Sequence, residues 1–346
     1  MDKITYEQYR AMLIDPDSPD EKIVEYSKVV PGKSAFGPEL VPDPEKVVMS
    51  EDEIEAENAM RIGNGLARWR RNRRVQRALR GNDPRPLLVA EGDSWFQFPL
   101  LIKEVVSQLG DDYLVWCVSA AGDTAQNMVF GAPEYMDALR RHNAGGRVAG
   151  FLFSAAGNDI IGQDEIASDP TPALIKILKR PAEAGSTAPA DYIDMSVLGE
   201  RLAFLRKAYM KVITDIRNDT AFKTLPIFIH GYDVPFPHPW EGDNRNPRWA
   251  AKDQWLGSAF SHHGITGANL QREILKLMID ALHDMFDKLA RDHTGVHIVD
   301  CRGAMPSVTD WADEIHGTSD GFAKVAQRFK KAIEAAIPAQ ADPLNA

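Results

Sequence analysis

Five short, continuous runs of apolar residues divide the chain from residue 87 onward. They span residues 87–90, 113–118, 148–153, 227–229 and 296–299. Because apolar and polar positions do not alternate within them, these runs are typical of strands buried on both faces. Stretches with helical periodicity lie between them, for example at residues 198–217 and 269–292. Strands that alternate with helices predict an α/β fold, in which helices cover both faces of a parallel sheet.

The first eighty residues follow a different pattern. Up to about residue 50 they are polar, acidic and rich in proline, so we expect short helices at best. Ser50 and Glu53 have the spacing of a capping box, which predicts a helix from there to about Arg80. The second half of this helix, residues 68–74, is basic. It is interpreted as a solvated face that pairs with the acidic segment or, alternatively, as a patch that binds phosphate or a partner.

The turn-forming residues 81–84 end this helix and predict a domain boundary. We therefore divide the chain into an N-terminal acidic segment and helix (1–82), an α/β domain (83–337) and a flexible tail (338–346). Two long insertions follow strands of the domain, at about residues 162–194 and 231–267. Because both insertions follow strand ends, we expect them to overhang Ser94, which follows the first of the five runs.

Composition excludes several classes of function. The chain has 346 residues, 44% hydrophobic and 26% charged, which allows a sizeable core and argues against a disordered chain. Its net charge of −10 argues against a nucleic-acid or anionic-membrane partner. No stretch of about 18 apolar residues could span a membrane, and the N-terminus lacks the apolar core of a signal peptide, so we expect a cytoplasmic protein. Cys117 and Cys301 adjoin apolar runs and are interpreted as buried thiols.

Residues whose side chains could take part in a reaction follow four of the five runs. They form the blocks Glu91-Gly92-Asp93-Ser94-Trp95, Ser119-Ala120-Ala121-Gly122-Asp123-Thr124, Ser154-Ala155-Ala156-Gly157-Asn158-Asp159 and Asp310-Trp311-Ala312-Asp313-Glu314-Ile315-His316. Because ligands of parallel sheets bind beyond the carboxyl ends of the strands, we expect these blocks to converge. Together they supply what acyl transfer requires, namely a hydroxyl nucleophile, amide donors, and an imidazole with a carboxylate.

In kind and order these four blocks resemble those of the SGNH (GDSL-type) hydrolase family, over roughly residues 85–335. The resemblance implies a three-layer α/β/α fold around a five-stranded, parallel, flavodoxin-like sheet, preceded here by a helical N-terminal extension. It also implies cleavage of carboxylic esters with no cofactor or metal. Two residues depart from the family pattern, since Trp95 stands where leucine is usual and Ala156 where the third block has glycine. We expect both to change the shape of the pocket more than the chemistry.

The expected roles follow the logic of serine hydrolases. Ser94 is the nucleophile, His316 is the general base and then acid, and Asp313 orients the imidazole. The resemblance implies an oxyanion hole made by the backbone N–H groups of Ser94 and Gly122 and by the side-chain amide of Asn158. Losing one such donor typically costs about 10²–10³ in rate.

Other polar residues receive structural interpretations. We expect the aspartates 93, 123 and 159 to bond loop backbone, and Asp310 is the alternative partner of His316. His230 is interpreted as pocket wall or structural support. His262 and His263 are adjacent and lack a carboxylate at metal-motif spacing, so no metal site is predicted.

The second insertion is rich in aromatic residues, which predicts either a lid or wall over the substrate or ordinary loop packing. We take Trp95, Tyr232, Phe236 and Trp240 as candidate substrate-binding residues. The predicted function is a serine esterase, lipase or deacetylase that acts on a small-molecule, lipid or sugar ester. The alternatives are an acyltransferase with the same site and an inactive hydrolase fold that serves as a binding module. The sequence leaves the acyl chain length, the leaving group and the oligomeric state open.

Overall fold

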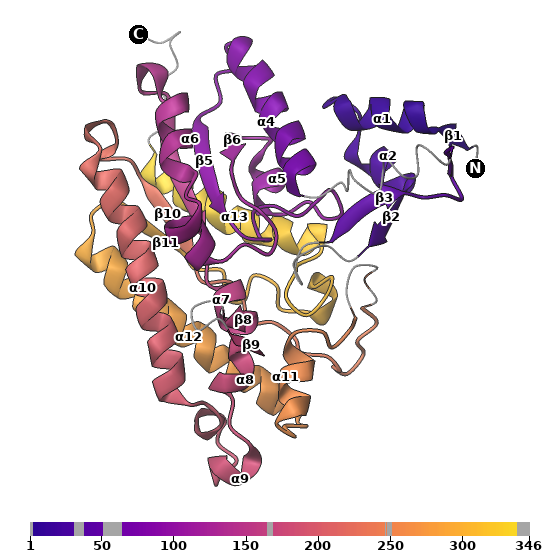
Figure 1. Cartoon of the computed structure of the whole chain (residues 1–346). Helices are drawn as coiled ribbons and strands as arrows, with labels where there is room; N and C mark the ends of the chain where they lie inside the picture. Colours follow the sequence, from indigo (N-terminus) through magenta and orange to yellow (C-terminus); the bar gives the residue numbers. More distant parts are fainter. Residues whose placement is uncertain are drawn as a thin grey trace.

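The computed structural model describes residues 3–30, 38–50, 64–164, 169–245, 247 and 251–337, and its centre is a five-stranded parallel sheet (Figure 1). The strand order is β11-β10-β7-β5-β6. These strands are β5 (Leu87–Gly92), β6 (Leu114–Cys117), β7 (Val148–Ser154), β10 (Ile227–His230) and β11 (Val296–Val299). In order of sequence this is the 2-1-3-4-5 arrangement of flavodoxin-like sheets. The predicted α/β fold with a five-stranded, parallel, flavodoxin-like sheet is confirmed.

Helices cover both faces of the sheet, which gives the three predicted layers (Figure 1). On one face, the ring of His230 in β10 contacts Phe329. On the other face, Phe153 in β7 contacts Tyr209. The first face is covered by α5 (Val105–Leu109) and α13 (Ser319–Ala336), and the second by α6 (Tyr135–His142), α10 (Met195–Asn218) and α12 (Ala268–Asp292). The helices predicted at residues 198–217 and 269–292 are thus confirmed as α10 and α12.

The N-terminal segment has a small core of its own. Its elements are β1 (Ile4–Thr5), α1 (Tyr6–Ile14), α2 (Asp20–Glu25), β2 (Ser27–Val30), β3 (Glu39–Pro42) and β4 (Val47–Val48). Our expectation of short helices at best was wrong in part, because β2 pairs with β3 and β1 with β4. Strands of two to four residues are too short for their periodicity to show in the sequence.

The basic helix is α4 (Asn64–Arg80), and it pairs with the acidic segment as one of our two interpretations held. Arg74 forms an ion pair with Asp20 at 2.7 Å. Arg70 also contacts Asp20, but its side chain is fully buried instead of solvated. The guanidinium of Arg70 donates further hydrogen bonds to the carbonyl oxygens of Met12, Leu13, Asp15 and Ser18. The predicted capping box and helix start fall largely on residues 51–63, outside the described part of the chain.

Helix α4 also contacts the edge of the main sheet. The side-chain amide of Asn72 donates to the carbonyl oxygen of Cys117 at 2.7 Å and accepts from its N–H at 2.9 Å, in the manner of a neighbouring strand. Val75 of the same helix lies in the core that surrounds the sheet. The segment before residue 82 therefore shares contacts with the domain, and the boundary at 82 stays a prediction. The predicted tail lies outside the described residues.

Both insertions contain regular structure. Residues 162–194 form β8 (Gln163–Asp164), β9 (Asp169–Pro172), α8 (Ala173–Ile177) and α9 (Pro181–Ala184), and residues 231–267 include α11 (Leu256–His262). Cys117 and Cys301 are free and fully buried, as predicted. Within the described ranges, no helix has the length and apolar character needed to cross a membrane.

Candidate active site

The turn after β5 presents Ser94. Strand β5 ends at Gly92, where a Cβ atom would lie 2.7 Å from the Cβ of Ser154, so only glycine allows this close approach of β5 and β7. The carboxylate of Asp93 then accepts the backbone N–H of Trp95 at 3.0 Å, which fixes the turn around residue 94. Ser94 itself is 3% exposed and lines a cavity.

Ser94, His316 and Asp313 form one hydrogen-bonded chain. The distance from Ser94 Oγ to His316 Nε2 is 2.8 Å, and that from His316 Nδ1 to Asp313 Oδ2 is 2.7 Å. Because a carboxylate can only accept, Nδ1 carries the proton and Nε2 offers its lone pair to the serine hydroxyl. The other carboxylate oxygen of Asp313 accepts the backbone N–H of His316 at 2.7 Å. This is the geometry in which an imidazole can remove the serine proton.

The position of the imidazole is fixed from two sides. The ring of His316 is 1% exposed and lies 4.7 Å from the ring of Phe98 and 5.7 Å from that of Trp255, between centroids. Arg245 donates to the carbonyl oxygen of Asp313 at 2.7 Å, which supports the loop that carries both residues.

Asp310, the alternative partner of His316, is engaged elsewhere. Its carboxylate contacts Lys324 Nζ at 2.6 Å and accepts the backbone N–H of Ser307 at 3.2 Å. Asp313, three residues before the histidine, is the carboxylate that contacts the imidazole.

The candidate oxyanion donors lie on neighbouring loops. Asn158 is in the first turn of α7 (Gly157–Ile161) and lines the same cavity as Ser94. Its amide nitrogen donates to the carbonyl oxygen of Asp123 at 2.6 Å, which uses one of its two N–H groups. Gly122 directly precedes Asp123 and has φ of 81°, a conformation that favours glycine. This hydrogen bond thus connects the loop of Gly122 with that of Asn158.

The three aspartates of the motif blocks bond loop groups, as expected. Asp123 accepts the backbone N–H of Thr124 and Asp159 that of Ala125, both at 2.9 Å. Asp93 has the largest set of partners. Its carboxylate accepts from Trp95 N, from Ser154 Oγ at 2.9 Å and from Tyr232 Oη at 2.5 Å. Burial raises the pKa of Asp93, and these hydrogen bonds oppose the rise.

His230 is connected to Asp93 through the hydroxyl of Ser154. Ser154 Oγ donates its proton to Asp93, so it must accept from His230 Nε2, 2.8 Å away. Nδ1 of His230 accepts the backbone N–H of Tyr232 at 3.3 Å. The imidazole therefore has its proton on Nε2 and is neutral, and burial lowers its pKa to about 3. His230 is a structural support, one of the two roles we expected.

Two buried carboxylates near the site were missed by the sequence analysis. Glu314, next to Asp313, accepts four backbone N–H groups at 2.7–2.9 Å, from His238, Trp255, Leu256 and Gly257. It joins the second insertion to the loop that carries Asp313 and His316, and burial raises its pKa while the four donors oppose the rise. Asp233 lines the cavity and accepts the N–H groups of Val234, Gly303 and Met305. No local signal in the sequence separates such carboxylates from solvated ones.

The candidate substrate-binding residues divide into two pairs. Trp95 and Tyr232 line the cavity. Phe236 and Trp240 are not among the described residues that line it. Their rings contact each other at 4.9 Å, and the guanidinium of Arg272 lies 4.1 Å from the ring of Phe236. For this pair, the structure shows the loop packing that was our alternative to a substrate wall.

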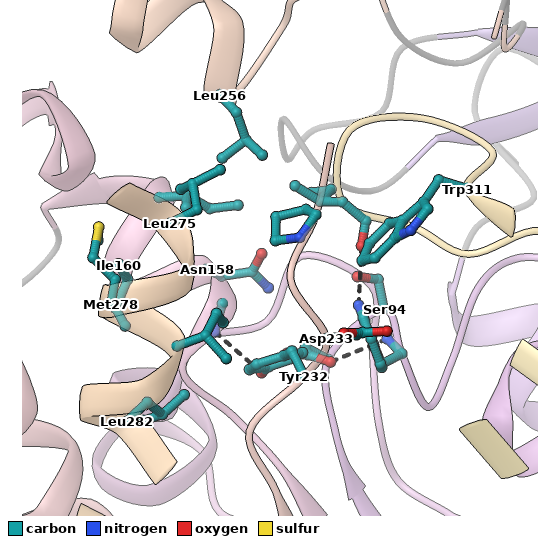
Figure 2. A pocket seen from close by; sticks show the side chains of 17 residues that line it. Ser94, Asn158, Ile160, Tyr232, Asp233, Leu256, Leu275, Met278, Leu282 and Trp311 are labelled. Carbon is teal, nitrogen blue, oxygen red and sulfur yellow. Dashed lines mark hydrogen bonds between the residues drawn. The ribbon is translucent and has the colours of Figure 1, made fainter. Parts of the chain in front are cut away.

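The cavity has a volume of about 90 Å³. Ser94 is one of the residues that line it (Figure 2). The second insertion contributes four lining residues to it, whereas the described part of the first contributes none. Four more come from α12, a helix that we expected only to cover the sheet. The residues that line the cavity from α12 are Leu275, Met278, Ile279 and Leu282. Their spacing is that of one helix face, so the sequence signal for them is the same as for a core stripe.

His262 and His263 show no sign of a metal site. The Nε2 atom of His263 lies 2.7 Å from the carbonyl oxygen of Ile175. Across the residues that the structure places, no group of three or more histidine, cysteine, aspartate or glutamate side chains could hold a metal ion.

No protein-family model matches the chain, and no curated protein matches it. Among solved structures, it is similar to a Streptococcus pneumoniae protein named for platelet activating factor, with 12% identity, a TM-score of 0.43, and coverage of 82% of this chain and 100% of that one. A family 3 carbohydrate esterase from Clostridium thermocellum has 13% identity, a TM-score of 0.38, and coverage of 72% and 97%. A member of the lipolytic G-D-S-L family from Veillonella parvula has 11% identity, a TM-score of 0.38, and coverage of 71% and 96%. The chain thus resembles SGNH and GDSL-type hydrolase and carbohydrate esterase structures, the resemblance that its four motif blocks predict.

Proposed function

We propose that the protein is a serine hydrolase that cleaves carboxylic esters. The observation that carries this proposal is the hydrogen-bonded chain Ser94–His316–Asp313 at one end of an apolar cavity. The choice of an ester as the substrate rests on the resemblance of the four motif blocks to those of SGNH hydrolases.

The mechanism follows from the positions of the protons. His316 Nε2 takes the proton of Ser94 as Oγ attacks the carbonyl carbon of the ester, and the imidazolium is stabilised by the carboxylate of Asp313. His316 then gives that proton to the leaving alkoxide, the ester C–O bond breaks, and the acyl group remains on Oγ. In the second half, His316 removes a proton from water as the water oxygen attacks the acyl carbon. The bond between the acyl carbon and Ser94 Oγ then breaks, His316 returns the proton to Oγ, and the carboxylic acid is released.

The negative charge on the carbonyl oxygen needs donors in both halves. We assign this role to the backbone N–H groups of Ser94 and Gly122 and to the free N–H of the Asn158 amide. Asn158 supports this assignment most directly, because its amide group lines the cavity beside Ser94 and is oriented by the carbonyl oxygen of Asp123. A donor that is already fixed in place needs no reorganisation when the charge develops.

The test compares two serines at the ends of adjacent strands. Ser94→Ala removes the proposed nucleophile, whereas Ser119→Ala removes a buried hydroxyl that has no hydrogen-bond partner among the described residues. With p-nitrophenyl butanoate, we expect kcat to fall by roughly 10⁴–10⁶ in Ser94→Ala and to stay near the wild-type value in Ser119→Ala. Normal turnover by a folded Ser94→Ala protein would refute the assignment. No turnover by the wild type would favour the binding module.

Acyl transfer is the second candidate, and one observation favours it. Ser94 and His316 are 3% and 1% exposed, so bulk water has little direct access to the proposed nucleophile and base. The ratio of free acid to new ester, measured with a fixed p-nitrophenyl ester and increasing alcohol, separates the two. A new ester that dominates at low alcohol concentration would identify a transferase, and free acid as the main product would identify a hydrolase.

A further inference from the structure

The cavity beside Ser94 has a wall that is mainly apolar. Figure 2 shows Ile160, Leu275 and Met278 on one side of Asn158, with Ser94 and Trp311 on the other. The apolar residues that line the cavity are Trp95, Ile160, Ile161, Pro235, Leu256, Leu275, Met278, Ile279, Leu282, Trp311 and Ile315. They come from segments far apart in the sequence, so the wall is a product of the fold and not of one loop.

Helix α12 reaches the site because it is much longer than the strands that it covers. Its 25 residues extend over about 38 Å, whereas a four-residue strand such as β11 spans only about 13 Å. The helix leads into β11 and therefore runs opposite to the strands, with its first half beyond their carboxyl ends. Leu282 is the last cavity residue, and Phe286, one turn later, contacts Tyr209 in the core. One continuous apolar face of α12 thus lines the cavity up to Leu282 and packs in the core from Phe286 onward.

The polar groups of the cavity leave little for a sugar to bind. The carboxylate of Asp233 already accepts three backbone N–H groups, and that of Asp93 accepts three donors. Of the described residues that line the cavity, none is cationic. Sugar hydroxyls or an anionic group would lose hydrogen bonds to water here without replacement, which is costly. A hydrocarbon chain loses nothing and gains from burial.

We propose that this cavity is the acyl site of the enzyme and that it takes unbranched aliphatic acyl groups of short to medium length. The proposal rests on the proposed function, because it assumes that Ser94 carries the acyl group. The acyl group stays bonded to Ser94 after the alcohol has left, and a cavity that includes Ser94 and is otherwise lined mainly by apolar side chains fits the group that stays.

The size of the cavity sets the range of chain lengths. Its volume of about 90 Å³ is well above the roughly 10–15 Å³ that one water molecule requires. The lining row from Leu275 to Leu282 extends over about 10 Å of the helix axis. Acetyl leaves most of this space empty, and palmitoyl exceeds it. We therefore place the optimum between butanoyl and octanoyl, and we assign the limit to Met278 and Ile279.

The experiment measures kcat/KM for p-nitrophenyl esters from acetate to palmitate, which share one leaving group. We expect a rise of about fourfold for each added methylene up to the optimum, followed by a fall. Ile279→Trp fills part of the cavity and should move the optimum to shorter chains. Met278→Ala enlarges it and should move the optimum to longer chains. Leu277→Trp is the matched control, because residue 277 is on the same helix but exposed, and its profile should equal that of the wild type.

The outcomes separate this proposal from the proposed function. If no ester is turned over and a fluorophosphonate does not label Ser94, the proposed function fails. If esters are turned over but acetate or acetylated sugars are best, or the two cavity variants leave the optimum unchanged, the acyl site is refuted. A chain-length optimum that appears only when the alcohol of alkyl acetates is varied would assign the cavity to the alcohol instead. Thermal unfolding of each variant identifies a loss of fold, and Met278→Ala decides the matter if Ile279→Trp does not fold.

Discussion

The hydroxyl of Tyr232 joins two parts of the proposed active site. It donates to Asp93 Oδ2 at 2.5 Å and accepts the backbone N–H of Gly157 at 3.1 Å. Asp93 precedes the proposed nucleophile, and Gly157 precedes Asn158, the proposed oxyanion donor. Tyr232→Phe removes this hydroxyl and keeps the ring. Because φ of residue 232 is 65° in either case, the substitution leaves the backbone strain unchanged.

The cost can be worked from the two lost bonds. A hydrogen bond to a charged group contributes about 1.5–3 kcal/mol, and a buried N–H left without a partner costs about 1–3 kcal/mol. We expect the free energy of unfolding to fall by roughly 2.5–6 kcal/mol in total. The deficit should shrink as the pH falls and Asp93 becomes protonated, because the lost bond favours the ionised carboxylate.

The activity should fall as well, because displacement of a reacting group by about 1 Å can cost 10²-fold in rate. We expect kcat with p-nitrophenyl butanoate to fall by about 10–100-fold, with KM changed much less. Tyr135→Phe is the matched control, since Tyr135 Oη donates at the same 2.5 Å to Asp215, a residue outside the four motif blocks. It should lower the stability and leave kcat unchanged. A Tyr232→Phe enzyme with wild-type kcat would refute the reasoning.

Three further predictions concern single residues. Asn158→Ala should lower kcat by about 10²–10³ if its amide binds the oxyanion, whereas an unchanged kcat would remove it from that role. Ala156 has φ of 127°, where the family pattern has glycine, so Ala156→Gly should raise the free energy of unfolding by about 1 kcal/mol, measured by denaturant titration. His230 has a folded-state pKa of about 3, below that of an unfolded histidine, so the stability it contributes is full above about pH 6.5 and is lost toward pH 3. Relative to His230→Gln, the wild type should therefore lose about 1.4 kcal/mol per pH unit in that window; parallel stability curves would contradict this.

Much of the fold and the contact between Ser94 and His316 could be predicted from the sequence. Continuous apolar runs mark the buried strands, and the parallel arrangement brings the residues that follow them to one edge of the sheet. Side chains 222 positions apart in the chain therefore meet at 2.8 Å. This inference needs only the kind of residue after each strand, and not the conformation of any loop.

The rest of the site depends on burial and direction, which local sequence does not specify. In the sequence, Glu314 cannot be distinguished from a solvated glutamate. Only the folded insertion places four backbone N–H groups around its carboxylate. Met278 belongs to an apolar helix face whose spacing in the sequence is the same as that of a face packed in the core. Only the length of α12 relative to β11 places it at the cavity. Phe236 and Trp240 were chosen for their aromatic character, but Arg272 packs on Phe236 away from the cavity.

The most direct test of the account is covalent capture of the nucleophile. A fluorophosphonate reacts only with a serine whose hydroxyl is activated by a base, so labelling reports the Ser94–His316 pair and not the choice of ester. We predict one adduct per chain, located by mass spectrometry on the peptide that contains Ser94, absent in Ser94→Ala and strongly slowed in His316→Ala. A folded wild-type protein that takes up no label, or that carries the label on another residue, would contradict the central claim.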